Sequence, residues 1–138
     1  MIEDFASDTS EGRMAVFRHL VELYARADVD AMAALIAPDY VGHTSAGDRD
    51  WAEFRQSILN FHHIFEYAPD AFIVEDQFAN GDKVATRMTA RVRNRETGEP
   101  MTMVGINIAV IRGGQVLEEW NSWEMVQSAQ SLSVQGAS

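Results

Sequence analysis

The sequence predicts one α+β domain in which three N-terminal helices pack on a curved, mostly antiparallel sheet. Two observations predict this class. In the first half, apolar residues recur at gaps of three and four, the period of an amphipathic helix. In the second half, alternating segments are separated by turn residues such as Asn80-Gly81-Asp82 and Gly113-Gly114. Helices and strands that are segregated along the chain indicate an α+β fold, and 138 residues suit a single domain.

Three segments have the helical period. The apolar stripe of the first consists of Met14, Phe17, Val21 and Tyr24. The second is expected over residues 31–36, with Asp28 or Asp30 as its N-cap and Pro38 closing it. The third follows Asp50, whose side chain can cap it. Its stripe consists of Trp51, Phe54, Ile58, Phe61 and Phe65.

Five segments read as strands. A short one, Tyr40–Thr44, lies between the second and third helices. Four longer ones form a meander in the second half, over residues 71–78, 83–95, 101–112 and 115–126. A long curved sheet that closes over helices makes a cone, and the pocket inside such a cone is a usual place for a small molecule.

Composition bounds the function classes. The net charge of −10 argues against nucleic acid or an anionic membrane as a partner. The absence of cysteine excludes disulfides, thiolate metal sites and cysteine nucleophiles. We expect a soluble cytoplasmic protein, with residues 1–10 as a flexible arm, 11–127 as the domain and 128–138 as a loosely held tail.

Four stretches, taken in order, resemble one known family. They are DVDAMAALIAPDYVGHTSAG, YAPDAFIVEDQFANGDKVATRMT, IRGGQVLEEWNSWE and SVQGA. The order and spacing of the residues in these stretches resemble the motifs of the SnoaL-like polyketide cyclases, which belong to the nuclear transport factor 2-like superfamily. The resemblance implies a cone-shaped, cystatin-like α+β barrel and an enzyme that works without cofactor or metal. It also implies an apolar or aromatic small-molecule substrate.

Two asparagines fall where the family carries its chemistry. Counting from Trp120 puts Asn121 at the place of the family's acid/base aspartate, and Asn107 lies on or near a family histidine. A neutral amide cannot act as a base, but Asn121 can stabilise an enolate oxygen. The alternative is that the two amides satisfy each other inside the sheet. A two-residue Gly113-Gly114 loop would set Asn107 opposite Trp120, whereas a three-residue loop would set it opposite Asn121.

His43 is the remaining candidate for moving protons, because its unperturbed pKa near 6.5 suits transfer at neutral pH. It follows an apolar strand, where the family often has a histidine at the pocket mouth. The competing interpretation is a half-buried structural histidine bonded to a neighbouring carbonyl. The sequence therefore predicts His43 and Asn121 as the catalytic pair, and no metal site.

Arg87 falls at an arginine of the family pattern and is a candidate substrate-binding residue. The family pattern places Arg87 inside, paired with an acid such as Glu118, Glu119 or Glu124, whereas strand alternation places it on a solvated face. A structural ion pair is the favoured interpretation of Arg87. The other substrate-binding candidates are Tyr24, Tyr40, Phe54, His62, Asn107 and Trp123, although aromatic residues at such spacings also form plain core.

Two functions stay open at this point. The first is an enzyme acting on a polyketide-type or other cyclic carbonyl compound by proton abstraction, followed by aldol cyclisation or isomerisation. The alternative is a non-catalytic module of the same fold that binds small molecules or serves assembly. In either case Val104, Ile106, Ile108 and Val110 make the sheet apolar on its second face, which predicts a homodimer packed sheet to sheet.

Overall fold

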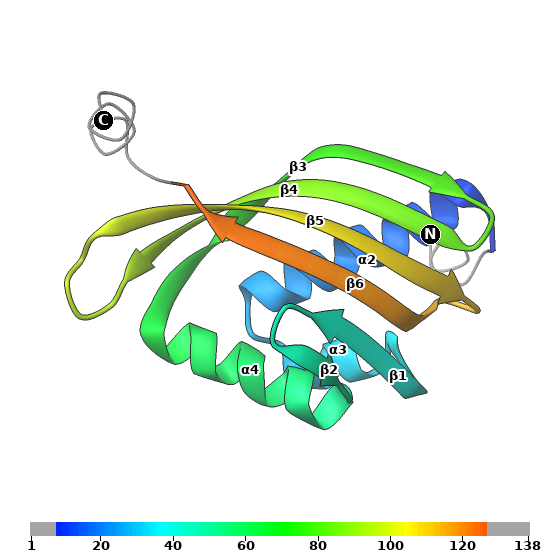
Figure 1. The fold of residues 1–138 in the computed structure, drawn as a ribbon, viewed down its shortest axis with the longest axis horizontal. Helices are drawn as coiled ribbons and strands as arrows, with labels where there is room; N and C mark the ends of the chain where they lie inside the picture. The colour runs from blue at the N-terminus through cyan, green and yellow to red at the C-terminus, as the bar shows by residue number, and fades with distance from the viewer. Residues whose placement is uncertain (1–7, 127–138) are drawn as a thin grey trace.

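The computed structural model describes residues 8–126 and has the predicted α+β architecture. Six strands form one curved sheet in the order β2-β1-β6-β5-β4-β3. All neighbouring strands are antiparallel except β1 and β6, which run parallel. Figure 1 shows the helices gathered on one side of this sheet, so that the other side is left without a helical layer.

Each of the three helices begins after a residue whose side chain caps it, and the cap at Asp50 was predicted. The first, α2 (Ser10–Ala25), starts after Thr9, whose hydroxyl accepts a hydrogen bond from the Gly12 amide. The third, α4 (Trp51–Ile64), starts after Asp50, and Glu53 completes a capping box. The second, α3 (Val29–Ala33), is capped by Asp28.

The predicted extent of this second helix was wrong. It ends at Ala33, and Ile36 already belongs to strand β1 (Ile36–Thr44), which also contains Pro38. Only one turn of helix fits before Ile36 pairs with Val116 of β6. The short apolar segment is therefore used as a strand, because periodicity alone cannot separate the two states over so few residues.

The strands agree with the predicted meander and extend it. A short β2 (Gly47–Arg49) pairs with the end of β1, and β3 (Phe65–Asn80) starts directly after α4. The remaining strands are β4 (Lys83–Asn94), β5 (Pro100–Arg112) and β6 (Gln115–Met125). Burial alternates strictly along β4, so one face of the sheet is covered and the other is open.

The pairing of β5 with β6 has the two-residue loop of one alternative but the Asn107–Asn121 register of the other. Gly113 and Gly114 both have positive φ and form a two-residue turn, with Arg112 opposite Gln115. A β-bulge between Val110 and Ile111 then shifts the pairing by one residue. As a result Asn107 lies opposite Asn121, and both side chains point to the covered face.

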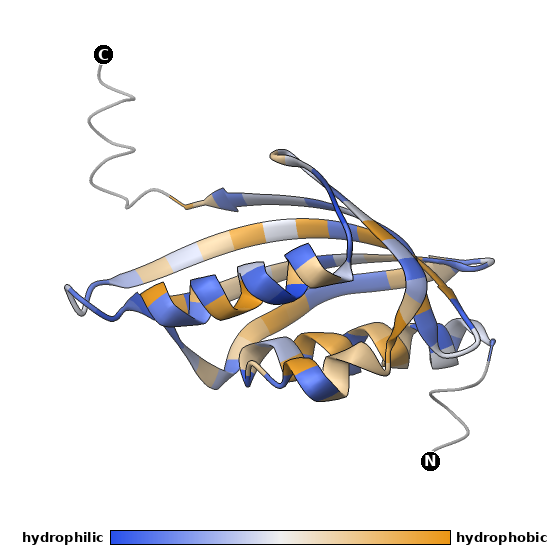
Figure 2. Cartoon of the chain, turned by 90° about the horizontal axis from the view of Figure 1, so that it is seen from below, coloured by the Kyte–Doolittle hydropathy of each residue, from blue (hydrophilic) through white to orange (hydrophobic). Residues whose placement is uncertain are grey.

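The core lies between the helices and this covered face. Phe17 and Leu20 of α2 and Ile58 of α4 pack there against strand residues such as Val84 and Ile111. Figure 2 shows both longer helices with orange and blue residues on alternate sides, as the amphipathic stripes require. Within residues 8–126, no helix is long and apolar enough to span a membrane.

Candidate active site

A cavity of about 520 Å³ opens between α2, α4 and the concave face of the sheet. Its walls are mostly apolar and aromatic, with Phe17, Phe54, Phe61, Phe72 and Trp123 among them. The β1–β2 hairpin contributes one rim, since residues 44–49 all line the cavity. A cavity of this size with a few convergent polar groups is typical of small-molecule sites.

Gly105 lets Trp123 form part of the wall. The two residues are cross-strand partners on β5 and β6. A Cβ atom on Gly105 would lie only 2.4 Å from the indole ring of Trp123, so the ring rests against the glycine backbone. The absence of a side chain at this position therefore sets the place of the indole.

Glu119 supplies a carboxylate at the inner end of the cavity. Its side chain is only 2% exposed. The Tyr40 hydroxyl donates a hydrogen bond of 2.5 Å to Oε1, and Asn107 Nδ2 donates one of 2.9 Å to Oε2. These bonds hold the carboxylate in one orientation and leave it with further acceptor capacity, because a carboxylate has about four lone-pair sites.

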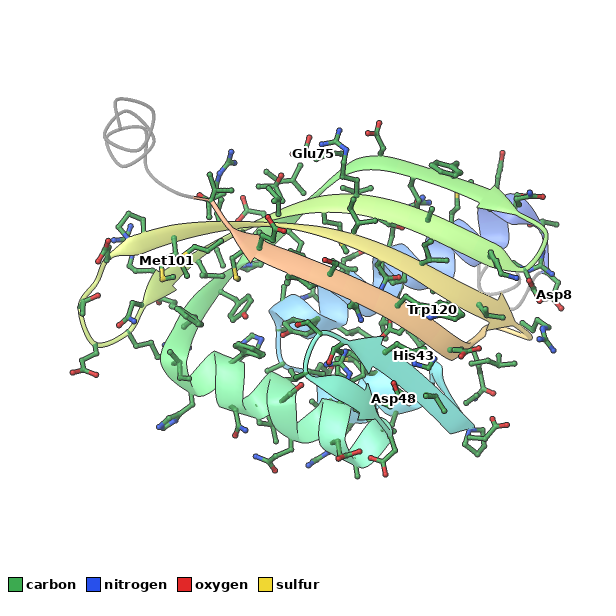
Figure 3. All side chains as sticks on the ribbon, in the orientation of Figure 1. Asp8, His43, Asp48, Glu75, Met101 and Trp120 are labelled. Carbon is green, nitrogen blue, oxygen red and sulfur yellow. The ribbon has the colours of Figure 1, made fainter. Side chains whose placement is uncertain are left out.

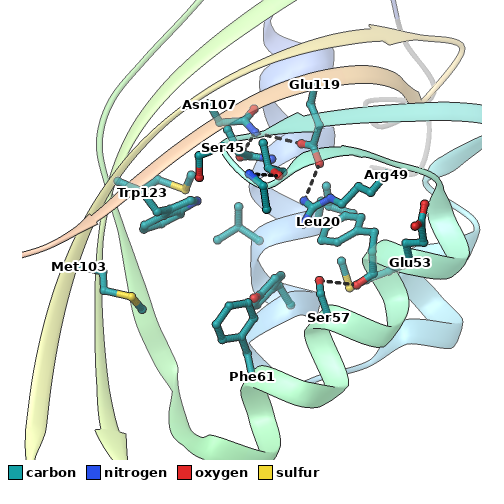
Figure 4. Close-up of a pocket in the computed structure, with 18 of the residues that line it drawn as sticks. Leu20, Ser45, Arg49, Glu53, Ser57, Phe61, Met103, Asn107, Glu119 and Trp123 are labelled. Carbon is teal, nitrogen blue, oxygen red and sulfur yellow. Dashed lines mark hydrogen bonds and ion pairs between the residues drawn. The ribbon is translucent and has the colours of Figure 1, made fainter.

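Burial and the neighbouring Glu119 raise the pKa of the Tyr40 hydroxyl far above its usual value near 10. Tyr40 thus remains a hydrogen-bond donor at any working pH. Figure 4 shows Glu119, Asn107 and Arg49 converging from three different strands on this end of the cavity.

Arg49 brings the positive charge of the site. Its Nη2 lies 3.7 Å from Glu119 Oε1, and its guanidinium carbon lies 4.0 Å from the centre of the Phe54 ring. The Nε of Arg49 is buried, and no hydrogen-bond partner is found for it among the described residues. Gly42 leaves room for this arrangement, since a Cβ there would lie 2.4 Å from the Tyr40 hydroxyl and 3.1 Å from Arg49 Nε.

The two asparagines are joined by a hydrogen bond from Asn107 Nδ2 to Asn121 Oδ1. Asn107 is fully buried, whereas Asn121 is half-buried and lines the cavity. The oxygen of the Asn121 amide is used by Asn107, so the end left for a ligand is its Nδ2 group, a donor. Asn107 acts as a bridge that fixes Glu119 and Asn121 relative to each other.

The opposite end of the cavity is aromatic. Tyr24 and Tyr67 share a side-chain hydrogen bond, and burial raises the pKa of both hydroxyls. His62 stacks on Tyr67 with ring centres 4.1 Å apart, and its Nε2 lies 2.7 Å from the Tyr24 carbonyl oxygen. Burial lowers the pKa of His62, so the neutral imidazole donates this hydrogen bond.

The family model of the SnoaL-like domain matches residues 17–119. The chain belongs to the SnoaL-like domain family. The matched span begins within α2, contains α4 and strands β1 to β5, and ends within β6, so it contains most of the cavity described above.

Solved structures similar to this SnoaL-like domain share its fold. IdmH, a proposed polyketide cyclase from Streptomyces antibioticus, is 28% identical, with 81% of this chain and 91% of that one covered and a TM-score of 0.73. AclR, a proposed hydroxylase from Streptomyces galilaeus, is 16% identical over 94% and 92%, with a TM-score of 0.77. An LEH-like epoxide hydrolase of M. tuberculosis is 10% identical over 83% and 84%, with a TM-score of 0.69. No curated protein matches the sequence.

Most of the candidate residues that the sequence singled out meet at this cavity. Tyr24, Phe54, Asn107, Asn121 and Trp123 line it. Tyr40 reaches the site through its hydrogen bond to Glu119. His62 lies behind Tyr24 and Tyr67 and supports them. What these residues do in this domain stays a prediction.

The expected position of His43 at the pocket mouth is corrected by the structure. His43 pairs with Trp120 on β6, and their rings stack on the uncovered face of the sheet (Figure 3). Its Nδ1 lies 2.8 Å from Asp48 and its Nε2 lies 2.6 Å from Glu118. The hydrogen bond to Glu118, and to a smaller extent the one to Asp48, raises the pKa of His43 above 6.5. Alternate residues of β1 point to opposite faces of the sheet, so His43 points away from the cavity. His43 is connected to the cavity rim only through its hydrogen bond to Asp48, which lines the cavity.

Arg87 is likewise placed outside the cavity. Its side chain is 54% exposed and forms an ion pair of 2.6 Å with Asp76 on the neighbouring strand. Strand alternation therefore predicted the position of Arg87 correctly, on the solvated face of the sheet. The expectation that Arg87 binds substrate is not supported, because the side chain lies outside the cavity.

Sequence reasoning missed Glu119 and Arg49. Glu119 is two residues before Asn121, so the alternation of β6 already puts both on one face, and it was considered only as an ion-pair partner for Arg87. Arg49 lies in the turn before the third helix, where neither helical nor strand periodicity predicts which way a side chain points. Only the pairing of β2 with β1, with Gly42 opposite Arg49, brings the guanidinium inward.

Proposed function

We propose that this SnoaL-like domain is an enzyme that abstracts a proton next to a carbonyl group in a polyketide-type or other cyclic carbonyl compound, with Glu119 as the base. The observation that carries the proposal is a carboxylate buried to 2% exposure and fixed by Tyr40 and Asn107 at the closed end of an apolar cavity. A carboxylate in such surroundings can exchange a proton with a carbon acid without competition from water.

A free lone pair of Glu119 takes the α-proton of the substrate, and the electron pair of the broken C–H bond forms an enolate. The Nδ2 group of Asn121 donates a hydrogen bond to the enolate oxygen, and Arg49 lowers the energy of the negative charge. In an aldol closure the enolate carbon then attacks a second carbonyl, and the Glu119 carboxyl returns its proton to the new alkoxide.

The walls of the cavity favour flat, apolar substrates. Phe54, Phe61, Phe72 and Trp123 offer aromatic surfaces to a ring system, and the few polar groups lie together at the Glu119 end. A cyclic ketone would therefore enter with its apolar part toward Tyr24 and Tyr67 and its carbonyl toward Asn121. The structural similarity to IdmH, a proposed polyketide cyclase, supports this substrate class.

The proposal is tested by hydrogen–deuterium exchange, which needs no knowledge of the natural substrate. 2-Tetralone is a flat bicyclic ketone with acidic α-protons, and proton NMR in D₂O follows their loss. We expect the wild-type domain to accelerate exchange beyond the buffer rate and Glu119→Gln to lower that acceleration by about 10²–10⁴-fold.

Glu118→Gln is the matched control, because it neutralises the neighbouring carboxylate on the uncovered face. It should leave the exchange rate unchanged. Equal losses in both variants would contradict the role of Glu119. Binding of 2-tetralone without any exchange in the wild type would overturn the catalytic proposal and support the non-catalytic binding module.

A further inference from the structure

The end of the cavity away from Glu119 carries two hydroxyl groups that the proposed reaction does not use. Tyr24 comes from α2 and Tyr67 from the start of β3, and both line the cavity. Their ring centres lie 5.8 Å apart, and the centre of the Phe72 ring lies 5.3 Å from that of Tyr24 and 5.9 Å from that of Tyr67. The two hydroxyls are therefore polar groups among aromatic rings, where an unpaired donor is costly.

The hydrogen bond between the two tyrosines leaves one O–H group free to donate. Burial raises the pKa of both hydroxyls, and the bond adds to this rise for Tyr24 but opposes it for Tyr67. These opposite effects arise when Tyr24 donates and Tyr67 accepts, because the bond stabilises the anion of the accepting oxygen. No acceptor for the Tyr67 hydrogen is found among residues 8–126. Tyr67 is thus a neutral donor that a ligand can use.

His62 holds this donor in place. Its imidazole stacks on the Tyr67 ring with centres 4.1 Å apart, and its Nε2 donates a hydrogen bond of 2.7 Å to the Tyr24 carbonyl oxygen. His62 thereby connects the ring of Tyr67 to the backbone of α2. A donor that is already fixed loses little conformational freedom when a ligand binds, so more of the strength of its hydrogen bond appears as affinity.

The two polar ends of the cavity are separated by a single aromatic ring. The centre of the Phe54 ring lies 6.4 Å from that of Tyr24 and 5.8 Å from that of Tyr40. The Tyr40 hydroxyl in turn bonds Glu119. A ligand of two or three fused rings that lies along Phe54 can therefore reach from the Glu119 end to the tyrosine end.

A ring system that fills the cavity displaces water from the Tyr67 hydroxyl. A carbon atom at that place leaves the donor unpaired, whereas an oxygen acceptor restores its hydrogen bond. Because the donor is neutral and its surroundings are aromatic, the acceptor that suits it is a neutral oxygen, as in an ether, a carbonyl or a hydroxyl group, and not a carboxylate.

We propose that the Tyr67 hydroxyl is a second recognition point, which selects cyclic ketones that carry a neutral oxygen at the end of the ring system away from the reacting carbonyl. The proposal rests on the proposed function, since it takes the reacting carbonyl to lie at Asn121. Such a compound meets a donor at each end, Asn121 Nδ2 at one and Tyr67 at the other, with aromatic walls between them. A ketone without the second oxygen binds more weakly, because it leaves Tyr67 unpaired.

The selection is tested with two ligands of one shape. 6-Methoxy-2-tetralone has an ether oxygen across the rings from the ketone, and 6-ethyl-2-tetralone has a methylene group in its place. Calorimetric titration gives the Kd of each compound, and the ratio of the two values isolates the effect of the oxygen. Because Tyr67→Phe removes the donor, it should shift this ratio by about tenfold in favour of the ethyl compound. The Kd of the ethyl compound itself should not weaken in Tyr67→Phe, which confirms that the cavity is intact.

Thr89→Val is the matched control, because it also removes one hydroxyl, but from the uncovered face, where Thr89 donates to Glu75. It should leave the ratio unchanged. Tyr24→Phe should shift the ratio less than Tyr67→Phe does, since Tyr67 keeps its hydrogen. Melting temperatures check that each variant folds.

The same ratio in the wild type and in Tyr67→Phe would overturn the proposal. A larger shift in Tyr24→Phe than in Tyr67→Phe would contradict the assignment of the donor to Tyr67. Equal weakening of both ligands in Tyr67→Phe would mean that the ketone itself lies there, which would also overturn the second recognition point. Because calorimetry reads binding and not exchange, each of these results is distinct from a failure of Glu119 as the base.

Discussion

Glu118 and Glu119 are neighbours in the sequence and have opposite environments. Glu119 is 2% exposed and is held by Tyr40 and Asn107 in the cavity. Glu118 is 40% exposed and faces His43 on the other side of the sheet. A strand turns successive side chains to opposite faces, so one residue of register separates a proposed catalytic carboxylate from an ordinary surface ion pair.

The same contrast extends to the strands beside β6. Asn107 and Ile106 are adjacent on β5, and the first is fully buried in a polar network while the second is more than half exposed. The covered face thus gathers a few fixed polar groups among apolar ones. The uncovered face gathers apolar residues with charges at their borders. The polar groups on the covered face are held by bonds that water cannot replace, so substitutions there should cost more.

The largest expected effect concerns catalysis on the two faces. Asn121→Ala removes the donor to the enolate and should lower 2-tetralone exchange by about 10²-fold. His43→Ala, on the uncovered face, should leave exchange unchanged. A loss of about 10²–10⁴-fold in His43→Ala would contradict this and would restore the sequence-based prediction that His43 moves the proton. Melting temperatures of both variants serve as the folding control.

A smaller effect is expected on stability when each glutamate loses its partner. Tyr40→Phe removes a hydrogen bond to a buried charged group, and the free energy of unfolding should fall by about 1.5–3 kcal/mol. His43→Gln breaks the corresponding exposed contact of Glu118 and should cost less, because surface ion pairs are screened by solvent. Urea unfolding of both variants at pH 7 measures the difference. Equal losses would show that the covered network is no stronger than the exposed one.

Packing on the covered face gives the next effect. Gly105→Ala would place a Cβ atom 2.4 Å from the Trp123 ring, so the indole must move, at a cost of about 1–3 kcal/mol. Ser122→Ala, next to Trp123 but on the uncovered face, should change stability by less than about 0.5 kcal/mol. Urea unfolding with tryptophan fluorescence follows both. An unchanged Gly105→Ala variant would mean that the indole has another position available.

The fold could be predicted from the sequence because its signals are local. The cap at Asp50, the Gly113-Gly114 turn and the alternation along β4 each fix a boundary or a face within a few residues. The second helix was predicted too long because five or six apolar residues fit a helix and a strand equally well. The four sequence stretches were sufficient for the family.

The site could be predicted only in part, because it depends on register over a longer range. The bulge between Val110 and Ile111 decides what lies opposite Asn107, and no residue pattern announces it. The face of His43 depends on the irregular pairing of β1 with β6 between Ile36 and Val41. Strand alternation from Asn121 was enough to predict that Glu119 lies on the same face, whereas the inward position of Arg49 depends on the pairing of β2 with β1.

The smallest effects come from two histidines whose pKa values move in opposite directions. Both nitrogens of His43 face carboxylates, which only accept hydrogen bonds, so the charged imidazolium fits the site and its pKa is raised above 6.5. This stabilisation is complete below pH 6.5 and is lost as the pH rises through the raised pKa. The difference in melting temperature between wild type and His43→Gln should therefore shrink from about pH 6 to pH 8.

His62 should give the reverse trend. Burial among Tyr24 and Tyr67 lowers its pKa below 6.5, so the neutral form is the stable one in the folded domain. The unfolded chain takes up the proton first as the pH falls, which draws the equilibrium toward unfolding. The stabilisation by His62 is thus complete above pH 6.5 and declines as the pH falls through the lowered pKa. The difference between wild type and His62→Gln should shrink from about pH 7.5 to pH 5.5, and parallel trends in the two variants would contradict the assignment of one histidine to each environment.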